Sequence, residues 1–420
     1  MKITRLLCAA AFFHGATAAQ AQTVTLDVQY ANPANGVKEL HDDLARMFSE
    51  RNPQVQIRFR TAPNGYAPLT EQVLRAAIVN NAPDVVFQGL NFLRTLVERD
   101  LTAPLEGFAA QDGGFEKLGY SASSLALGRI GGKVRGLPFA ISVPVLYVNG
   151  DLVRSAGHDP EALPATWPAL MAVGKAIEAR NEKKTGFFYR NDVDGNWMLQ
   201  ALVFSNGGSM LTPDETKVAF TEGAGRSALD TLESFARGGM PILTGSQARS
   251  AFGAGNIGIF ADSSSNIESI GRAVGQRFEY RIAPFPMPNP DGKLPAGGNL
   301  AVMLTKDAKK QAAAWEYIKF VTGPLGQTLM ATRTGYLPGN EIPLKDPEML
   351  AKFIAETKNR AVTATQLPRL TGWYAYPGKN ALKITDMIQN HLDGIVSRRH
   401  TASEAAAKIQ SDVEPLLAAR

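Results

Sequence analysis

The sequence has 420 residues, of which 45% are hydrophobic and 20% are charged, with 39 Gly, 25 Pro and one Cys. These proportions are those of a globular protein long enough for two or three folded units, so a disordered chain is excluded. The formal net charge is only +5, and Lys and Arg are scattered among Asp and Glu. Nucleic-acid binders cluster basic residues on one face, so no nucleic-acid partner is expected.

The N-terminus has the pattern of an export signal. Lys2 and Arg5 precede a short apolar stretch from Leu6 to Phe13, and Ala19-Gln20-Ala21 forms a small-x-small cleavage site. The pattern predicts a signal peptide over residues 1–21 that is cleaved on export to the periplasm. The apolar stretch is shorter than the roughly 20 residues that cross a bilayer, so it does not predict a membrane span.

The one cysteine, Cys8, lies inside this predicted signal peptide. Leu7 stands before it instead of a small residue, so a lipoprotein anchor is not expected. Cleavage after residue 21 leaves a chain without thiols. Thiol catalysis and Cys-ligated metal sites are therefore excluded for the mature chain.

Two periodicities predict the first five elements in chain order. Residues 23–30 alternate as a strand, 37–51 have helical spacing, 55–59 alternate again, 67–80 form a helix and 84–87 form a buried strand. The β-α-β-α-β order predicts an α/β unit with a mainly parallel sheet flanked by helices. Ligand sites in such units lie at the carboxyl ends of the strands.

A second α/β unit is predicted to begin near residue 140. Gly136-Leu137-Pro138 introduces an apolar strand over 141–148, and Thr166-Trp167-Pro168 opens a helix that runs to about Arg180. A threonine before the helix and a proline in its first turn are typical start signals.

The third part of the chain returns to the same pattern after a break. Residues 283–299 are rich in Pro and Gly, and a strand over 300–304 and helices over 308–321 and 324–333 follow. The segment 334–338 interrupts the pattern again. Repeated crossings of the chain between two α/β lobes account for this layout.

Motifs for catalysis are missing from the sequence. His41, His158, His391 and His400 remain after the predicted cleavage, and none belongs to an H-E-x-x-H pattern. No G-x-S-x-G or G-x-x-x-x-G-K-[ST] motif occurs either. The sequence therefore predicts no metal site and no catalytic residue.

Two patterns resemble parts of enzymes but have simpler interpretations. Residues 253–258 match G-x-G-x-x-G, yet they follow a predicted helix over 246–252 and precede a predicted strand over 257–260. This is the reverse of the dinucleotide-binding order, so the residues are interpreted as a turn. Asp192 and Asp194 form an acidic pair of the kind that glycosidases use, and an exposed acidic turn is the simpler interpretation.

Small polar groups collect at predicted strand ends and turns. These are Gln88-Gly89, Ser142, Ser263 to Ser265 and Gly297-Gly298-Asn299. Hydroxyls, amides and bare backbone suit a polyhydroxylated or anionic small ligand, because they satisfy its polar groups without large desolvated charges. Trp197 and Trp373 lie in polar or Gly-rich segments and are candidates to stack on the apolar side of such a ligand.

Several segments together resemble the extracellular solute-binding proteins, family 1, of ABC importers. The most specific run extends from Gly136-Leu137-Pro138-Phe139 through Val145 to Asn149 and Ala156 to Pro160, and ends at Thr166-Trp167. Supporting segments are Gly297 to Asn299, Ala314 to Phe320 and Thr334 to Pro338. The resemblance covers essentially the whole mature chain.

This resemblance implies an α/β, two-lobed, type II periplasmic-binding-protein-like fold, in which each lobe is a mainly parallel sheet flanked by helices. Residues 22–139 and about 300–335 would form one lobe, and about 140–299 and 336–420 the other, with the ligand cleft between them. A multi-segment hinge is expected near residues 139–143, 297–300 and 335–338.

The implied function is that of a periplasmic substrate-binding component of an ABC importer. It would capture a sugar, polyol or glycerol-phosphate-type ligand by hinge closure and deliver it to the transmembrane subunits of a permease. No enzymatic activity, cofactor or metal is expected, and a monomer is expected. A secreted carbohydrate-active enzyme and a periplasmic ligand sensor on the same fold are the alternatives.

Within the family, the chain is most similar to the glycerol-3-phosphate and glycerophosphodiester binders. By position, this similarity places ligand contacts on Tyr66, Ser142, Trp197, Ser264, Gly298 and Tyr336. The predicted ligand-binding set also contains Tyr30, Gln88, Asn91, Asn299, Trp373 and Tyr376. Replacement of Trp197 by alanine is expected to weaken binding with little effect on folding.

Two departures leave open whether the ligand carries a phosphate. The glycerol-phosphate binders have an Arg in the segment equivalent to Tyr374 to Asn380, where this chain has none. Their acidic residue after the third strand is Leu90 here. A phosphate could instead meet Lys379, Arg369 or the backbone N–H groups of a helix N-terminus.

Overall fold

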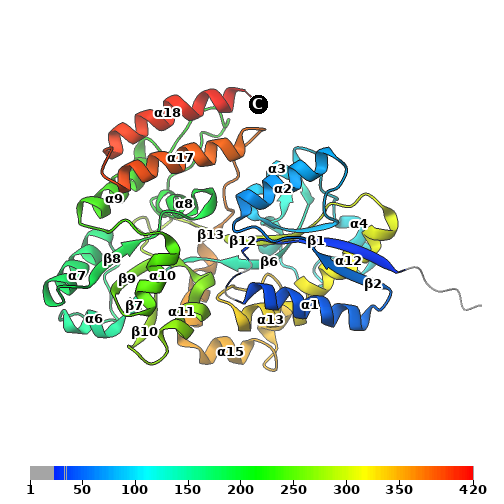
Figure 1. Ribbon diagram of the computed structural model, residues 1–420, viewed down its shortest axis with the longest axis horizontal. Coiled ribbons are helices and arrows are strands. Elements are labelled where there is room, and N and C mark those ends of the chain that lie inside the picture. The colour runs from blue at the N-terminus through cyan, green and yellow to red at the C-terminus, as the bar shows by residue number, and fades with distance from the viewer. Residues whose placement is uncertain (1–22, 33, 35, 420) are drawn as a thin grey trace, which may run out of the picture.

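A computed structural model describes residues 23–32, 34 and 36–419, so the predicted signal peptide and Cys8 lie outside the described residues. The chain folds into two lobes, each with a central sheet covered by helices (Figure 1). We call the lobe with the five-stranded sheet the first lobe and the lobe with the four-stranded sheet the second lobe. The two-lobed α/β architecture confirms the fold that the resemblance implied.

The first lobe is built on a sheet with the strand order β2-β1-β3-β12-β6. β1 pairs in parallel with β2 and β3, whereas β12 is antiparallel to β3 and β6. The strands are β1 (Val24–Gln29), β2 (Val55–Phe59), β3 (Val85–Gly89), β6 (Leu137–Ser142) and β12 (Gly297–Met303), with a small hairpin of β4 (Arg129–Ile130) and β5 (Lys133–Val134).

Four of the helices of this lobe, α1, α2, α12 and α13, lie where the sequence predicted helices, and the short α3, α4 and α5 were not predicted. α1 coincides with the predicted helix over 37–51, and its apolar residues Leu40, Leu44 and Phe48 are buried at helical spacing. The helices of the first lobe are α1 (Val37–Arg51), α2 (Tyr66–Ile78), α3 (Leu93–Val97), α4 (Glu106–Gln111), α5 (Ala122–Ala126), α12 (Ala308–Thr322) and α13 (Pro324–Arg333), with the single turn η1 (Leu90–Phe92).

The second lobe is built on a sheet with the order β10-β7-β9-β8. Only β8 and β9 are parallel, and β7 is antiparallel to both β9 and β10. The elements are β7 (Pro144–Asn149), β8 (Thr185–Tyr189), β9 (Ile257–Ser263), β10 (Tyr280–Pro284), α6 (Gly150–Ser155), α7 (Trp167–Arg180), η2 (Asp194–Asn196), α8 (Trp197–Ser205), α9 (Gly223–Arg237), α10 (Gly245–Gly253), η3 (Ser264–Asn266) and α11 (Ile267–Val274).

The expectation of mainly parallel sheets is therefore wrong for the second lobe and only partly right for the first. The β-α-β alternation that supports it holds for β1, β2 and β3, which are parallel. The chain passes from one lobe to the other and back through β6, β7 and β12. These strands are therefore antiparallel to their neighbours. Both sheets are mixed.

The sequence predicted one strand over 141–148, and the structure has two strands there. β6 ends at Ser142 in the first lobe, β7 begins at Pro144 in the second, and Val143 lies between them. A proline is tolerated at the first residue of a strand because its missing N–H breaks no ladder bond there. The apolar run is thus a crossing between the lobes.

The G-x-G-x-x-G segment lies between α10 and β9, in the order helix then strand. This confirms its interpretation as a turn. A dinucleotide would need the opposite order, because only a strand followed by a helix directs free N–H groups at its phosphates.

Three crossing segments lie side by side between the lobes. The first is at Val143, and the second is at Ala296, just before β12, whose Gly297 pairs with Ser142. The third is 334–338, where Leu337 exchanges two backbone hydrogen bonds with Ile141 (3.1 and 2.7 Å). β6 and β12 are seen at the centre of Figure 1.

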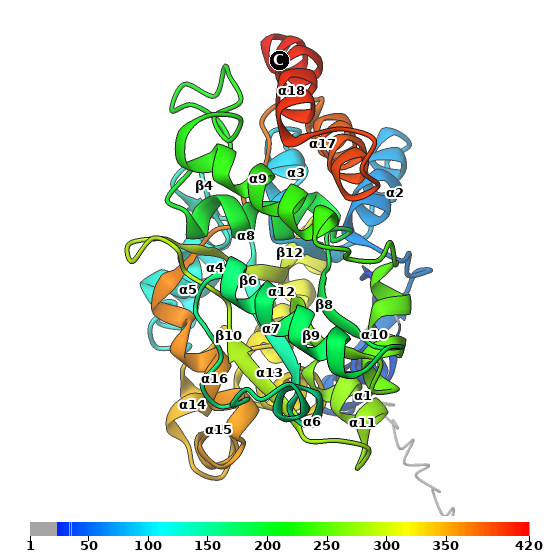
Figure 2. The same cartoon turned by 90° about the vertical axis from the view of Figure 1, so that its left-hand side faces the viewer.

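The C-terminal part of the chain returns to the second lobe. α16 packs against β10. α17 and α18 pack against α9, and these two helices form the layer at the top of Figures 1 and 2. α14 (Ile342–Lys345) and α15 (Ala351–Glu356) still pack on the first lobe, α14 against α13 and α15 against its core. The elements that follow them are α16 (Lys358–Thr365), η4 (Leu367–Arg369), α17 (Ala381–Val396) and α18 (Ala402–Ala418), with the short pair β11 (Leu294–Pro295) and β13 (Leu370–Thr371).

Polar contacts join the lobes away from the crossings. Arg94 on α3 forms a bidentate ion pair with Glu215 of the second lobe, at 2.6 and 2.8 Å. Glu98 accepts a hydrogen bond from the backbone N–H of Gly378 at 2.8 Å. These contacts tie α3 to the second lobe and its C-terminal segment.

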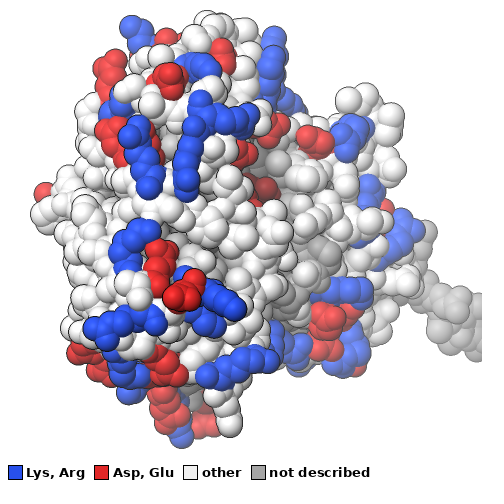
Figure 3. Space-filling view, turned by 60° about the vertical axis from the view of Figure 1, so that its left-hand side comes forward, with Lys and Arg blue, Asp and Glu red and all other residues white. Residues whose placement is uncertain are grey.

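The surface is mixed in charge, with basic and acidic side chains interspersed over the face in Figure 3. Within the part of the chain that the structure describes, no helix combines the length and the hydropathy needed to cross a bilayer.

Candidate functional site

A cleft of about 410 Å³ lies between the two lobes. Pockets of roughly 300–1,000 Å³ hold drug-sized ligands. Residues of both lobes and of the crossings line it: Asn32, Ala34, Val37, Asn64, Gly65, Tyr66, Ser142, Arg190, Asp192, Val193, Asp194, Trp197, Thr244, Ser246, Arg249, Ser263, Ser265, Asn266, Ser269, Gly297, Gly298, Arg333, Thr334, Tyr336 and Trp373.

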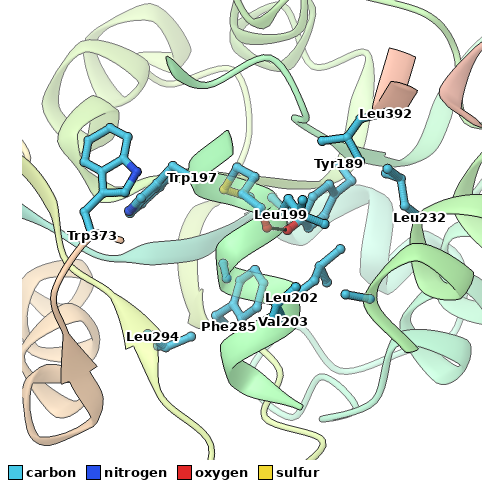
Figure 4. Packing of buried hydrophobic residues seen from close by; sticks show 14 of the residues in the cluster. Tyr189, Trp197, Leu199, Leu202, Val203, Leu232, Phe285, Leu294, Trp373 and Leu392 are labelled. Carbon is cyan, nitrogen blue, oxygen red and sulfur yellow. Dashed lines mark hydrogen bonds between the residues drawn. The ribbon is translucent and has the colours of Figure 1, made fainter. Parts of the chain in front are cut away.

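One end of the cleft is aromatic. Trp197, the first residue of α8, has its ring centroid 6.1 Å from that of Trp373, and Figure 4 shows the two indoles side by side. Tyr66, the first residue of α2, meets Trp373 edge-on at 6.2 Å. Trp197 and Trp373 are only 1% and 5% exposed, so each presents a narrow face to the cleft.

A cluster of charged side chains forms the second-lobe wall. Arg190 follows β8, and its guanidinium is 2.7 Å from Asp192 Oδ1 and 3.0 Å from Asp262 Oδ1. Arg249 on α10 reaches Asp262 Oδ2 at 3.4 Å. Asp262 is fully buried and also accepts from Asn266 Nδ2 at 3.3 Å. One buried carboxylate thus positions two guanidinium groups and an amide at the cleft.

The same cluster sets the charge states of its members. Burial alone would lower the pKa of Arg190, but Asp262 and Asp192 raise it above its ordinary value. Burial would raise the pKa of Asp192, but Arg190 and the backbone N–H of Gly245 bring it below its ordinary value. Arg190 and Asp192 therefore face the cleft as a charged pair near neutral pH.

Hydroxyl groups continue this wall along β9, η3 and α11. Ser263 and Ser265 are joined by a hydrogen bond between their Oγ atoms at 2.9 Å, and Ser269 lies one turn further. Thr244 and Ser246 line the cleft from the start of α10, where Thr244 caps the helix. Hydroxyls both donate and accept, so this wall can match a ligand that is rich in hydroxyl groups.

Asp194 connects the two lobes at the aromatic end. It belongs to η2 of the second lobe, and its Oδ2 accepts a hydrogen bond from the backbone N–H of Tyr66 at 2.6 Å. A Cβ on Gly65 would lie 2.7 Å from the same oxygen, so glycine leaves room for the carboxylate. Burial raises the pKa of Asp194, although the backbone N–H groups of Tyr66 and Ala67 act against it.

Gly298 forms part of the cleft floor at the second crossing. Its φ is +106°, and a Cβ there would lie 1.9 Å from the carbonyl oxygen of Ala140. Only glycine meets both requirements, because other residues rarely adopt this φ and the close atom belongs to the backbone.

Replacement of Gly298 by alanine is expected to lower the free energy of unfolding by roughly 1–3 kcal/mol, because strain at this φ adds to the backbone overlap. Urea unfolding measures the loss. Gly157→Ala is the matched control, since Gly157 has a φ of +83° but no atom within 4 Å of a Cβ. Equal losses in the two variants would show that the approach of Ala140 contributes nothing.

The structure brings half of the predicted ligand-binding set to the cleft. Tyr66, Ser142, Trp197, Gly298, Tyr336 and Trp373 line it. Asn299 and Ser264 lie just behind the wall: Asn299 Nδ2 donates to the Tyr66 hydroxyl at 3.0 Å, and Ser264 Oγ accepts from the N–H of Val143 at 3.1 Å. Their direct contact with a ligand stays a prediction.

The other four predicted residues do not line the cleft. Tyr30 stacks on His41 in the core of the first lobe at 4.0 Å, and Gln88 Nε2 donates to the buried hydroxyl of Thr70 on α2 at 2.8 Å. Asn91 is buried against Gly195, and Tyr376 packs on Tyr374 at 5.5 Å. These side chains follow strand ends or lie in Gly-rich segments, but they point into packed regions.

The arginines of the cleft were missed by the sequence prediction. Arg190, Arg249 and Arg333 line it, whereas Arg369 and Lys379, the proposed phosphate partners, do not. Arg190 directly follows the strand over 185–189, so a search for charged as well as hydroxyl groups at strand ends would have found it. Arg249 and Arg333 come from helices far apart in the sequence and carry no such signal.

The chemistry of this wall offers no metal site. Within the described residues, no three or more His, Cys, Asp or Glu side chains lie close enough to hold a metal ion. Asp192 and Asp194, the possible glycosidase pair, both line the cleft, but the first is ion-paired to Arg190 and the second is bonded to α2.

Comparisons with known proteins agree with this geometry. Residues 43–353 match the model of the family described as bacterial extracellular solute-binding protein. A Brucella abortus protein named as a putative binding protein is 22% identical over 84% of each chain. The sn-glycerol-3-phosphate-binding periplasmic protein UgpB of Shigella dysenteriae is 23% identical over 71% of this chain and 70% of its own.

Two solved structures show the same fold. UgpB from Mycobacterium tuberculosis, in complex with glycerophosphocholine, has a TM-score of 0.84 at 20% identity, covering 94% of this chain and 99% of its own. Maltose-bound MalE3 of T. maritima has a TM-score of 0.80 at 19% identity, covering 94% of this chain and 100% of its own.

The family match extends over most of the chain, so the protein belongs to the bacterial extracellular solute-binding proteins. This confirms the family that the sequence resembled.

Proposed function

We propose that the protein captures a polyhydroxylated small molecule in the cleft between its lobes and delivers it to the transmembrane subunits of an ABC permease. The observation that carries this proposal is the pairing of an aromatic end, Trp197 and Trp373, with a hydroxyl-rich wall, Ser263 to Ser269, in one cleft. The narrow parts of the two rings that line the cleft suit the apolar side of a sugar ring, and the hydroxyls suit its polar edge.

Known relatives support this class of ligand. The names of the relatives and structural neighbours include binders of sn-glycerol-3-phosphate, glycerophosphocholine and maltose. A cleft of about 410 Å³ has room for a ligand of drug-like size. We propose that the ligand is sugar-sized or larger and that the cleft residues of the predicted set contact it directly.

The proposal includes the setting of the protein. Residues 1–21 would be removed as a signal peptide, and the mature chain would act in the periplasm as a monomer without catalytic activity. The lobes would be 22–139 with about 300–335, and about 140–299 with 336–420, except that α14 and α15 pack on the first lobe. The paired crossings support a hinge at Val143, Ala296 and 334–338, where the lobes rotate around the ligand.

A thermal-shift panel of mono- and oligosaccharides, glycerol-3-phosphate, glycerophosphodiesters and sugar acids tests the proposal. One class is expected to stabilise the protein by about 2.7 kcal/mol at a hundredfold excess over its Kd. Arg249→Ala is expected to weaken that stabilisation, because Arg249 lines the cleft, whereas Arg226→Ala on α9 is the control. A panel in which no compound gives a saturable shift contradicts the proposal.

A further inference from the structure

The N-terminus of α2 faces the cleft. Gly65 and Tyr66 both line it, and α2 continues for 13 residues. The first N–H groups of a helix have no intrahelical partner and carry a partial positive charge, so they attract anionic groups. In a solute-binding cleft, this position would suit the phosphate of a ligand.

In this protein, the position is already occupied by a carboxylate of the chain itself. Asp194 Oδ2 accepts the N–H of Tyr66 at 2.6 Å, and Gly65 provides the space for it. Asp194 belongs to the second lobe and α2 to the first, so this bond forms only when the lobes are together. Closing of the cleft therefore places a negative charge where an anionic ligand would bind.

The positive groups of the cleft are also matched. Arg190 and Arg249 share Asp262, and Arg333 pairs with Asp43 on α1 at 2.6 Å. No lysine or histidine is found among the described residues that line the cleft, and no cation of the described chain forms an ion pair with Asp194. A phosphate would thus enter a cleft in which each arginine already has a carboxylate partner and Asp194 has no ion-pair partner among the described residues.

This pairing of the charged groups distinguishes between ligands with a phosphate and uncharged ligands, which the resemblance left open. Transfer of a phosphate from water costs several kcal/mol unless a positive or N–H partner replaces its hydration. A hydroxyl group has no such requirement, because neutral donors and acceptors of the serine wall satisfy it. The geometry thus favours an uncharged ligand.

We infer that Asp194 is a specificity-determining residue: by occupying the N-terminus of α2 in the closed cleft, it excludes phosphate and other anionic groups and restricts the ligand to uncharged polyhydroxylated molecules. The inference rests on the proposed function, since it concerns the same cleft. It separates this protein from relatives named for sn-glycerol-3-phosphate.

Isothermal titration with inorganic phosphate, glycerol-3-phosphate and maltose tests the inference on the mature protein and on Asp194→Ala. The wild type is expected to bind neither phosphate compound. Asp194→Ala frees the N–H of Tyr66 and removes the negative charge beside it. Its Kd for glycerol-3-phosphate is expected to lie at least about tenfold below the highest concentration at which the wild type shows no binding, a difference of at least about 1.4 kcal/mol. Asp100→Ala, at an exposed carboxylate of the first lobe, is expected to behave as the wild type.

Asp194→Asn keeps the volume and an acceptor oxygen, and it decides the outcome if the alanine variant does not fold. Its affinity for glycerol-3-phosphate is expected to change in the same direction. Wild-type binding of glycerol-3-phosphate that Asp194→Ala leaves unchanged overturns the inference. So does a lack of phosphate binding in both Asp194 variants. If the phosphate results are as expected but no uncharged compound binds, the proposed function fails while the role of Asp194 stands.

Discussion

Replacement of Trp197 by alanine is expected to lower the free energy of unfolding by about 3–5 kcal/mol, the usual loss for removing a buried aromatic side chain. Trp197 is 1% exposed, packs beside Trp373, and has its indole edge against Gly297. This burial argues against the expectation from the sequence that the change spares folding. The ring is part of the core of the second lobe as well as of the cleft (Figure 4).

Chemical unfolding followed by circular dichroism measures this loss without relying on tryptophan emission. Trp197→Phe retains an aromatic ring and is expected to recover a large part of the stability. An unchanged unfolding midpoint in Trp197→Ala would contradict the packing argument. Binding by either variant has to be measured at a temperature where the variant remains folded, because lost stability would otherwise resemble lost affinity.

Acidification is expected to destabilise the protein through His41. The side chain is 1% exposed, and burial lowers the pKa of His41 from 6.5 to about 3. In the unfolded chain, the imidazole takes up a proton near pH 6.5, whereas in the folded chain it remains neutral until about pH 3. The stability is thus fully present above pH 6.5 and decreases by about 1.4 kcal/mol for each pH unit between these values.

The replacement His41→Phe isolates this effect. Tyr30 stacks on His41, and Phe59, Phe87 and Phe139 surround it, so phenylalanine fits the same aromatic environment. Urea unfolding at a series of pH values is expected to show a flatter pH dependence for His41→Phe than for the wild type. His158→Gln, at an exposed position, is the control. If the slope of the wild type persists in His41→Phe, then other groups cause the acid sensitivity.

Local patterns predicted the elements well, because each depends on a short stretch of sequence. The buried face of α1 repeats at helical spacing, and α12 and α13 begin after Asp307 and at Pro324, which are start signals. Pairing direction depends on which distant strands meet. The run over 141–148 is apolar throughout, so its periodicity does not show that Ser142 and Pro144 belong to different sheets.

The cleft was predictable where strand ends contribute to it and unpredictable where helices do. Ser142, Gly298 and Ser264 were found at strand ends or turns, and two of them line the cleft. Arg249 lines it because α10 packs beside β9, and Asp194 matters because the start of α2 lies opposite. Arg249 and its partner Asp262 are 13 positions apart, and Tyr66 and Asp194 are 128 apart, so both relations depend on how separate elements pack.

The position of β12 has a consequence for the order in which the protein folds. β12 lies between β3 and β6, which do not pair with each other, so the sheet of the first lobe stays divided until residue 303 has been synthesised. The four strands of the second lobe's central sheet all lie between residues 144 and 284, so that sheet can close earlier. The sheet that begins first is therefore completed last, and the open edge of β3 is exposed to wrong pairing in the meantime.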